Sequence, residues 1–542
     1  MGRLRVTIAC LLFTLPLLEM RSVAQAAVLS TVPVFPHISS TQKWDDFQVL
    51  VTVEAPKQEP RLPVHLVFVH SVSNVEVLNE VKNAVEFIRV HLLGTGKEDR
   101  VTIVGPSDNG EDHVIHEVSA EVTSTKEITV FKAHSDGSKF KILLEKATWT
   151  VKQSQHAGAI ILLTDGKSLH DEVVDWVVGK TGCNYPVHTF GLGANHDHEK
   201  LRRIASASVG GTYSFVDEEN AKMISAALAV CVGGLKNVVV PATSKLKLEA
   251  AAGVEIKRIR YGQYNAITTQ SSTAGDQNVV KIGMLHTGET KKIVVHLAVQ
   301  PEGDAPRDGG GCGGRTLLTA SFFRGAGDAA PAASKAVCVE RRPPGAPAVQ
   351  TAPSPLVLQE VVRYNLLDVV HQISVSSSTT TATTTSIATV LEEKLDVFVQ
   401  THQYWSGIDV VLGGLQKEIH DMKAYAVAAS SSSSGSAAAT AYIHSWMSSY
   451  ETQRATAMGA RSYFGSTFAT QEVSTTVQVA TQIIESNISL GSCNGICQEE
   501  DYCLEQVTEV IMKALRETKR WKECGSKPAD GYYLTPNGPL TD

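Results

Sequence analysis

The chain has 542 residues, which is enough for two to four domains of ~100–200 residues each. Hydrophobic residues make up 43% and charged residues 19%, so the chain can bury a large core and global disorder is excluded. A formal net charge of −7 argues against a nucleic-acid partner. Nine cysteines are too few for a scaffold built on disulfides. No apolar run reaches the ~18–20 residues of a membrane span, so we expect no transmembrane segment.

Residues 1–26 have the pattern of a secretory signal. Arg3 and Arg5 form a basic start, an apolar run covers Val6–Leu18, and Ala24-Gln25-Ala26 is a small-residue cleavage site. We therefore predict a secreted protein, or one of the secretory pathway, with one glycosylation site at Asn487. If the leader is retained, a cytoplasmic location is the alternative.

The segment 28–62 is polar, punctuated by proline, and holds one strand candidate at Phe47–Glu54. From residue 63 to residue 235, apolar runs alternate with helical periods. Buried strands without polar alternation, separated by amphipathic helices, predict a doubly wound parallel sheet covered on both faces. The runs are Val64–Val69, Val101–Val104, Ala159–Leu163, Pro186–Phe190 and Thr212–Val216.

The pattern changes after residue 235. Short strand candidates separated by Gly, Asn and Asp turns over residues 236–340 predict an antiparallel β sandwich. Residues 343–355 form a Pro/Ala-rich linker, and residues 356–485 have helical periods. Two low-complexity tracts, Ser376–Thr385 and Ala426–Thr440, are predicted to be flexible loops.

The tail, residues 486–542, carries four cysteines. In a secreted chain one or two disulfides are the simplest interpretation, with three full pairings open, whereas in a cytosolic chain the same residues would be free thiols or a poor zinc site. The four are Cys493, Cys497, Cys503 and Cys524.

Hydroxyl and carboxylate side chains follow the first and third apolar runs of residues 63–235. Ser71 and Ser73 come at the end of the first run, and Asp165 ends the third. Ser138 begins a helix on another loop. Parallel strands open onto one crevice at their carboxyl ends, where ligands usually bind. Oxygen ligands from three loops are what a hard cation such as Mg²⁺ needs.

The segments Pro63–Ser73, Ala159–Gly166, Pro186–His198 and Ala207–Phe215 together resemble a known family, the von Willebrand factor A domain. The detail is closest to the A domains of plant WAVY-GROWTH-type RING ubiquitin ligases and their RING-less relatives. The resemblance extends over residues 28–482. It rests on Pro63–Ser73, Ala159–Gly166, Pro186–His198, Ala207–Phe215 and Cys231–Leu235, with Leu29–Thr31, Phe35-Pro36, Gly262–Tyr264, Gly283, Gly288-Glu289, His444–Trp446 and Gln453–Ala457 outside the A domain.

The resemblance implies a metal-ion-dependent adhesion site with the pattern Asp-x-Ser-x-Ser, a Thr and a further Asp. Carried over, the first Asp falls on Ser71, the two Ser on Ser73 and Val75, the Thr on Ser138 and the last Asp on Asp165. Loss of one carboxylate and one hydroxyl weakens cation binding. We therefore expect a degenerate site with no cofactor and at most weak Mg²⁺ binding. Its remaining residues Ser71, Ser73 and Asp165 either only cap helices and loops or line a crevice that binds a partner without metal.

No other motif in the sequence predicts catalysis. Gly166-Lys167-Ser168 lacks the upstream glycine of a phosphate loop, because Ile161 stands there. His196-Asp197-His198 could offer two imidazoles to zinc, but Asp197 at a loop-to-helix junction is better explained as a helix cap. His70 beside Ser71 points to the opposite side of a strand, which disfavours a hydrolase.

The sequence therefore predicts a non-enzymatic protein-binding module with an unidentified protein partner. The given residues before the A domain contain no paired cysteines, so we expect no RING here. A RING-less adaptor or competitor in a ubiquitin-ligase pathway is the alternative, and it requires a cytosolic chain.

Overall fold

The structure is a computed structural model. It describes residues 27–57, 60–89, 98–106, 114–119, 137–167, 169–180, 185–217, 223–262, 278–301, 314–325, 327–343, 352–379, 387–403, 405, 407–430, 435–459 and 466–485. The predicted leader, the glycosylation site Asn487 and the cysteines Cys493, Cys497, Cys503 and Cys524 lie outside the described residues.

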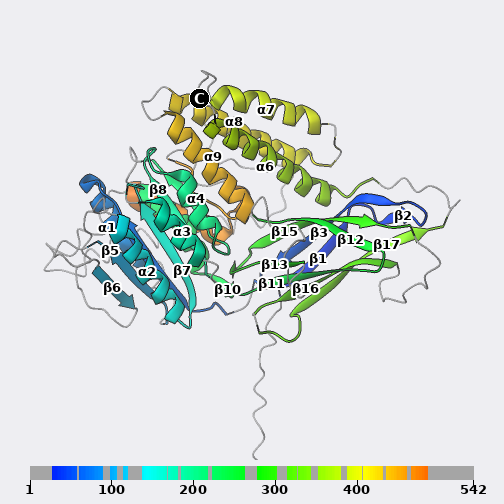
Figure 1. Ribbon diagram of the computed structural model, residues 1–542, viewed down its shortest axis with the longest axis horizontal. Coiled ribbons are helices and arrows are strands. Elements are labelled where there is room, and N and C mark those ends of the chain that lie inside the picture. The colour runs from blue at the N-terminus through cyan, green and yellow to red at the C-terminus, as the bar shows by residue number, and fades with distance from the viewer. Residues whose placement is uncertain are drawn as a thin grey trace, which may run out of the picture.

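An α/β domain, residues 64–235, is built on a six-stranded sheet with the order β6-β5-β4-β7-β8-β9 (Figure 1). Five of these strands are parallel, and β6 pairs antiparallel with β5 at one edge. Every residue of β4, β8 and β9 is buried, so apolar side chains lie on both faces of each strand, and polar residues among them such as His65 and His188 are hydrogen-bonded. The strands are β4 (Val64–Ser71), β5 (Arg100–Gly105), β6 (Val114–Ser119), β7 (Ala157–Thr164), β8 (Val187–Leu192) and β9 (Tyr213–Val216).

Helices cover both faces of this sheet, as the sequence predicts. The face formed by Leu66, Phe68 and Ile161 packs against α1 (Val75–Ile88) and α5 (Ile224–Leu235). All twelve residues of α5 are buried, including the thiol of Cys231, whose pKa burial raises to about 12. The other face packs against α2 (Gly137–Gln153), α3 (Asp171–Lys180) and α4 (His198–Ser206).

A β sandwich made of two larger sheets lies beside the α/β domain (Figure 1). One sheet has the order β1-β3-β15-β12 and the other β13-β11-β16-β17-β2, while β10 pairs with β14. All pairs are antiparallel except β17 with β2. The strands are β1 (Val28–Pro33), β2 (His37–Ser39), β3 (Trp44–Glu54), β10 (Val238–Val240), β11 (Lys245–Ala250), β12 (Val254–Arg260), β13 (Val279–Lys281), β14 (Leu285–His286), β15 (Thr290–Val299), β16 (Arg315–Phe323) and β17 (Ala333–Arg342).

The N-terminal segment is part of this sandwich. Strand β3 pairs with β15 over the register Glu54↔Thr290 to Trp44↔Val299, so β1 and β3 complete a sheet whose other strands follow the α/β domain. Isolated two-stranded ribbons are marginal in water, so β1 and β3 gain their stability from this distant partner. The α/β domain is therefore inserted between two parts of one sandwich.

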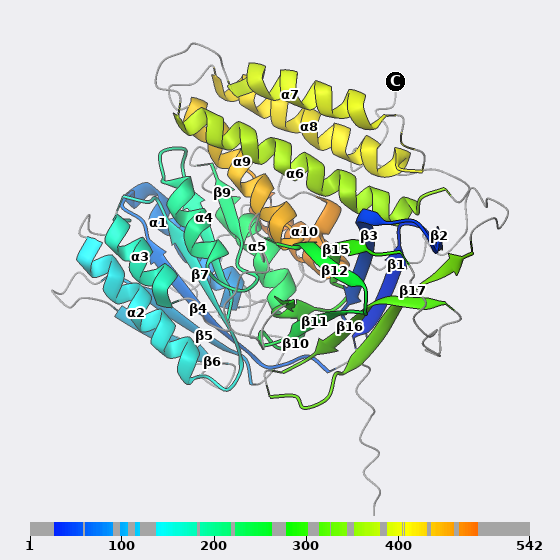
Figure 2. The ribbon, with the colours of Figure 1, turned by 45° about the vertical axis from the view of Figure 1, so that its right-hand side comes forward.

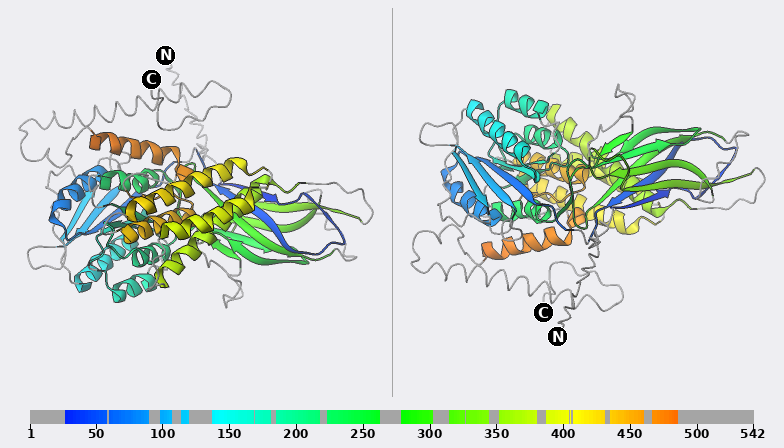
Figure 3. Two further views of the ribbon diagram at one scale, coloured as in Figure 1. Left: turned by 90° about the horizontal axis from the view of Figure 1, so that it is seen from above. Right: turned by 90° about the horizontal axis from the view of Figure 1, so that it is seen from below.

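The helical region is stacked over the α/β domain and the sandwich (Figure 2). It contains α6 (Pro355–Thr379), α7 (Ile387–His402), α8 (Asp409–Ser430), α9 (Gly435–Thr452), a short 3₁₀ helix (Ser466–Phe468) and α10 (Gln471–Glu485). Helix α9 crosses between α6 and the α/β domain, and α10 lies along one side of that domain, where it packs on α5 (Figures 2 and 3). No helix among the described residues combines the length and the apolar character that crossing a membrane requires.

The prediction of a flexible loop over Ala426–Thr440 is wrong for most of its length. Helix α8 continues to Ser430 and α9 begins at Gly435. Alanine has the highest helix propensity, and Ala438 and Ala439 are buried. Likewise α6 extends to Thr379, into the predicted loop Ser376–Thr385. In the second tract, the buried Ala426, Ala438 and Ala439 are small residues that let the helices pack closely.

Candidate functional site

The predicted crevice lies at the carboxyl ends of β4 and β7, which are neighbours in the sheet. The chain leaves β4 towards β5 on one side, and β7 leads to β8 on the other, so this is the point where the strand order reverses. Such switch points are where open α/β sheets bind ligands. Ser71 is the last residue of β4 and is buried, and Asp165 directly follows β7.

Asp165, Ser73 and Lys167 form one hydrogen-bonded group. Ser73 donates twice to Oδ2 of Asp165, through its backbone N–H at 2.9 Å and through its hydroxyl in a short contact. The Nζ of Lys167 lies 2.9 Å from Oγ of Ser73 and 3.8 Å from the same Oδ2. The side chain of Asp165 is 11% exposed and that of Lys167 is 65% exposed. An ammonium group therefore contacts the two oxygens that the resemblance assigns to a cation.

The structure thus brings together two of the four predicted crevice residues, Ser73 and Asp165, and adds Lys167. Ser138 is the second residue of α2 and Val75 the first of α1, and their side chains lie outside the described part. Lys167 is a residue that sequence reasoning missed. Lys167 belongs to the triplet Gly166-Lys167-Ser168, which does not qualify as a phosphate loop. Its position two residues after Asp165 is the sequence feature that could have identified it as a site residue.

The turn after Asp165 is held against the loop that follows β8. Gly166 has φ +76° and an added Cβ would lie 3.0 Å from Cβ of His196, so only glycine fits. Asp197 caps α4 and accepts a hydrogen bond from the N–H of Lys200 at 3.0 Å, as the sequence predicts. The imidazole of His196 is bonded on both nitrogens, to the carbonyl of Gly193 and to the hydroxyl of Tyr213 at 2.5 Å.

His196 is a structural residue on this evidence. Burial lowers the pKa of its imidazole to about 4, so the ring is neutral at pH 7. Gly191 makes room for it, because a Cβ there would lie 2.2 Å from Nε2 of His196. With both nitrogens engaged, His196 is unable to ligate a metal without breaking an internal hydrogen bond.

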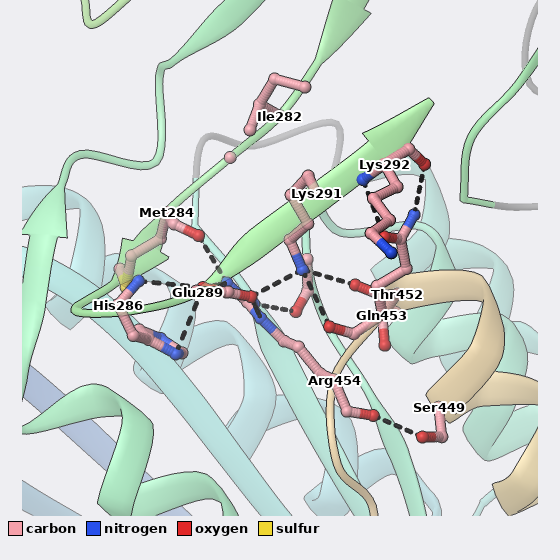
Figure 4. A network of polar contacts seen from close by, with 12 residues as sticks. Ile282, Met284, His286, Glu289, Lys291, Lys292, Ser449, Thr452, Gln453 and Arg454 are labelled. Atoms are coloured by element: carbon pink, nitrogen blue, oxygen red, sulfur yellow. Dashed lines mark hydrogen bonds and ion pairs between the residues drawn. The ribbon is translucent and has the colours of Figure 1, made fainter. Parts of the chain in front are cut away.

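A second polar cluster, the Arg454 network, joins all three parts of the molecule (Figure 4). Arg454 follows α9, and its guanidinium makes a bidentate pair with Glu289 of the sandwich, Nε–Oε1 at 2.7 Å and Nη2–Oε2 at 3.2 Å. Its Nη1 donates to the carbonyl of Gly210 in the α/β domain at 2.7 Å, and its Nη2 donates to the carbonyl of Met284. Lys291 Nζ lies 2.6 Å from Oε1 of Glu289 and also donates to the Thr452 carbonyl.

Burial and charge oppose each other in this network. Burial alone would raise the pKa of Glu289, but Arg454 and Lys291 overcome it and hold that pKa well below its usual range. Burial lowers the pKa of Lys291 to about 8, against the pull of Glu289. Burial also lowers the pKa of His286 to about 3. The charges pair with one another and with backbone carbonyls, so we interpret the network as a structural link.

The segment after Arg454 closes one edge of the α/β sheet. Ala457 O accepts from the N–H of Phe215 in β9 at 2.9 Å, and Gly459 N–H donates to the Phe215 carbonyl at 2.9 Å. The hydroxyl of Ser445 in α9 donates to Ala457 O at 2.6 Å. The motif Gln453–Ala457, which carried part of the family resemblance, thus contributes to joining the helical region to both other parts.

Comparison with known proteins identifies the family of the α/β domain. Residues 64–215 match the von Willebrand factor type A domain family, so the α/β domain is a von Willebrand factor A domain and the predicted fold class is confirmed. Curated protein sequences include no match to the chain. A solved structure of a von Willebrand factor type A protein from Catenulispora acidiphila is similar with TM-score 0.52 and 11% identity, over 72% of this chain and 90% of that one. The ArnB paralog VWA2 from Sulfolobus acidocaldarius gives TM-score 0.46 and 14% identity, over 79% and 99%.

Proposed function

We propose that this chain, which carries a von Willebrand factor A domain, is a non-enzymatic protein-binding protein whose partner docks at the crevice between β4 and β7 without a metal ion. Domains of this family typically mediate protein interactions. The observation that carries the proposal is the position of the Lys167 ammonium, 2.9 Å from Ser73 Oγ and beside Asp165. The other two crevice residues of the proposal are Ser71 and Ser138.

The ligand set supports a site that works without a cation. Mg²⁺ requires near-octahedral oxygen ligands and sheds its water reluctantly. Asp165 is the one carboxylate at the positions carried over, and its Oδ2 already accepts two hydrogen bonds from Ser73. An incoming ion would have to displace Lys167 and reorient the Ser73 hydroxyl. We therefore propose that the degenerate adhesion site holds no cofactor and that Lys167 supplies its positive charge.

Lys167 also indicates the chemistry of the partner. Its side chain is 65% exposed and its charge is only partly satisfied by Asp165 at 3.8 Å. An ammonium at a crevice rim attracts a carboxylate, so an acidic side chain of the partner fits this position. Surface charge pairs of this kind act mainly on association rate and orientation, and they weaken as salt is raised.

The position of His70 supports the non-enzymatic proposal. The ring of His70 is buried beside Gly105, where an added Cβ would lie 2.2 Å from its Nε2. Because successive side chains of a strand point to opposite faces, the side chain of Ser71 lies on the face of β4 opposite to that of His70. His70 is therefore not positioned to activate Ser71, and the Ser73 hydroxyl is held between Asp165 and Lys167.

The test is site-specific photo-cross-linking in the full chain. A photoreactive residue at position 74, beside Ser73, should capture a protein, and the capture should fall several-fold when Lys167→Glu is added. A matched control is Lys152→Glu on α2, an exposed lysine away from the crevice, which should leave the capture unchanged. Equal capture by both variants, with equal melting temperatures, would place the partner elsewhere.

The proposed location is the secretory pathway, with cleavage after Ala26, glycan at Asn487 and disulfides among the tail cysteines. The alternative is a cytosolic RING-less adaptor in a ubiquitin-ligase pathway, which the resemblance to plant WAVY-GROWTH-type ligases suggests. Mass spectrometry of the native protein separates them. A chain that begins at Ala27 and is glycosylated excludes the adaptor, whereas an intact leader without glycan favours it.

A further inference from the structure

Three side chains that commonly ligate metals meet where α4 packs against α9. His198 and Glu199 are the first two residues of α4, and His444 lies in α9 of the helical region. One ligand atom of each, a ring nitrogen or a carboxylate oxygen, lies within 4.8 Å of the other two. The two imidazole rings have centroids 4.5 Å apart. We call these residues the interdomain triad.

His444 supplies the second observation. Its side chain is buried with 3% of the residue exposed, and its Nδ1 has no hydrogen-bond partner. A buried polar atom without a partner is costly and requires an explanation. Its other nitrogen, Nε2, lies 2.8 Å from Oγ of Ser374 in α6. Donation from Nε2 to that hydroxyl leaves a lone pair on Nδ1, which is how an outer hydrogen bond prepares a histidine ligand.

We propose that His198, Glu199 and His444 bind a divalent transition-metal ion, zinc in particular, and that the ion ties the α/β domain to the helical region. Two imidazoles and one carboxylate are a zinc ligand set, and they leave a fourth position for water. Mg²⁺ and Ca²⁺ prefer oxygen ligands alone, which makes them poor competitors here. This site lies on α4 and α9 and shares no residue with the crevice between β4 and β7.

The geometry needs only a small adjustment. Tetrahedral zinc with bonds of ~2.0–2.2 Å brings its ligand atoms to about 3.4 Å from one another. The ligand atoms of the interdomain triad lie within 4.8 Å, and Glu199 is exposed at a helix end, so its side chain is free to swing inward. The exposed side of Glu199 also gives an ion a route from solvent.

Neighbouring charges are already compensated. Arg202, one turn after His198 on α4, forms an ion pair with the buried Glu451. Lys200 is bound to both Asp171 at 3.1 Å and Asp197 at 3.3 Å. These cations are therefore occupied by carboxylates, and Glu199 remains to offset part of the charge of an incoming ion.

The test uses the full chain after chelator treatment. Calorimetric titration with Zn²⁺ should show saturable binding in the micromolar range or tighter. His198→Gln and Glu199→Gln should each weaken it at least ~10-fold, and Ser374→Ala, which removes the hydrogen bond to His444, should weaken it by ~10–100-fold. His170→Gln is the matched control, since His170 is an exposed histidine of the same domain and should leave the affinity unchanged. His444 itself is left intact because its burial makes a folding defect the expected result.

Cobalt distinguishes the interdomain triad from the cysteines of the chain. Co²⁺ bound by the triad should give the visible bands of a four- or five-coordinate ion without the intense thiolate-to-cobalt charge-transfer band. These bands should be lost in His198→Gln and retained in His170→Gln. The proposal is overturned by a thiolate band alone, by binding that His198→Gln and Glu199→Gln leave unchanged, or by no saturable binding at millimolar metal.

Discussion

Replacing Arg454 with methionine should destabilise the whole molecule, because one guanidinium joins its three parts. The side chain is buried and bonds a carboxylate of the sandwich, a carbonyl of the α/β domain and the carbonyl of Met284. Arg454→Met keeps the length of the apolar stem and removes every one of these contacts. Removing one member of a buried ion pair costs about 3–5 kcal/mol.

The remaining partners determine where in that range each variant falls. After Arg454→Met, Glu289 retains Lys291 at 2.6 Å and the N–H of His286 at 2.9 Å, so its charge stays paired. After Glu289→Gln, two buried cations face each other without a carboxylate. We therefore expect Glu289→Gln to cost more than Arg454→Met, and the double variant to cost less than the sum by about 0.5–3 kcal/mol.

Urea unfolding of the full chain, followed by circular dichroism, measures these free energies of unfolding. The matched control is Arg203→Met, which breaks an exposed ion pair with Asp175 whose side chains are 56% and 62% exposed. That variant should cost less than about 1 kcal/mol. Equal losses for Arg454→Met and Arg203→Met would refute the conclusion that the Arg454 network links the three parts.

Three further predictions concern the α/β domain. The free energy of unfolding should decrease as pH falls from 6.5 towards 4, because burial holds the pKa of His196 at about 4 in the folded protein while the unfolded chain binds the proton. This contribution is at most about 3 kcal/mol, and in urea titrations His196→Gln should show a smaller change of the free energy of unfolding with pH. Gly191→Ala should lower the free energy of unfolding by about 1–3 kcal/mol, because the added Cβ would lie 2.2 Å from the His196 ring. Gly179→Ala in α3, where no atom lies within 4 Å of the added Cβ, should raise it by about 0.5–1 kcal/mol. A higher melting temperature for Gly191→Ala than for Gly179→Ala would contradict this prediction. Calorimetry of the His198→Gln variant with Mg²⁺ or Mn²⁺ at millimolar concentration should show no saturable binding at the crevice, and clear binding that Asp165→Ala abolishes would show that the remaining oxygens suffice.

The buried strands of the α/β sheet are predictable because their local pattern alone decides them. Ala159–Leu163 is apolar throughout and Val64–Val69 is apolar except for His65, as expected for strands covered on both faces. Strand β6, with the sequence Val-Ile-His-Glu-Val-Ser, has no such run, and the sequence does not predict it. The sequence pattern also does not predict the pairing of β3 with β15, because the α/β domain separates the two strands along the chain.

The residues of the candidate site also divide into those that the local sequence predicts and those whose role depends on the folded backbone or on distant segments. The places of Ser73 and Asp165 follow from strand ends, which the sequence shows. The role of Lys167 depends on the turn that Gly166 makes with φ +76°, a conformation that brings the ammonium back to Ser73. The partners of Arg454 come from three separate segments, so no spacing within the motif Gln453–Ala457 predicts them.

Because residues 457–459 pair with β9, the α/β domain has to be studied within the full chain. An edge strand exposes unpaired backbone groups that promote aggregation, and here residues 457–459 pair with Phe215 and cover that edge. Helix α5 is buried on all sides because α10 packs against the face that the sheet leaves uncovered. Residues 64–235 alone would therefore expose both an apolar helix face and a sheet edge. Loss of partner binding by that fragment would reflect these exposed surfaces, so the crevice and the interdomain triad have to be tested by point substitutions in the full chain.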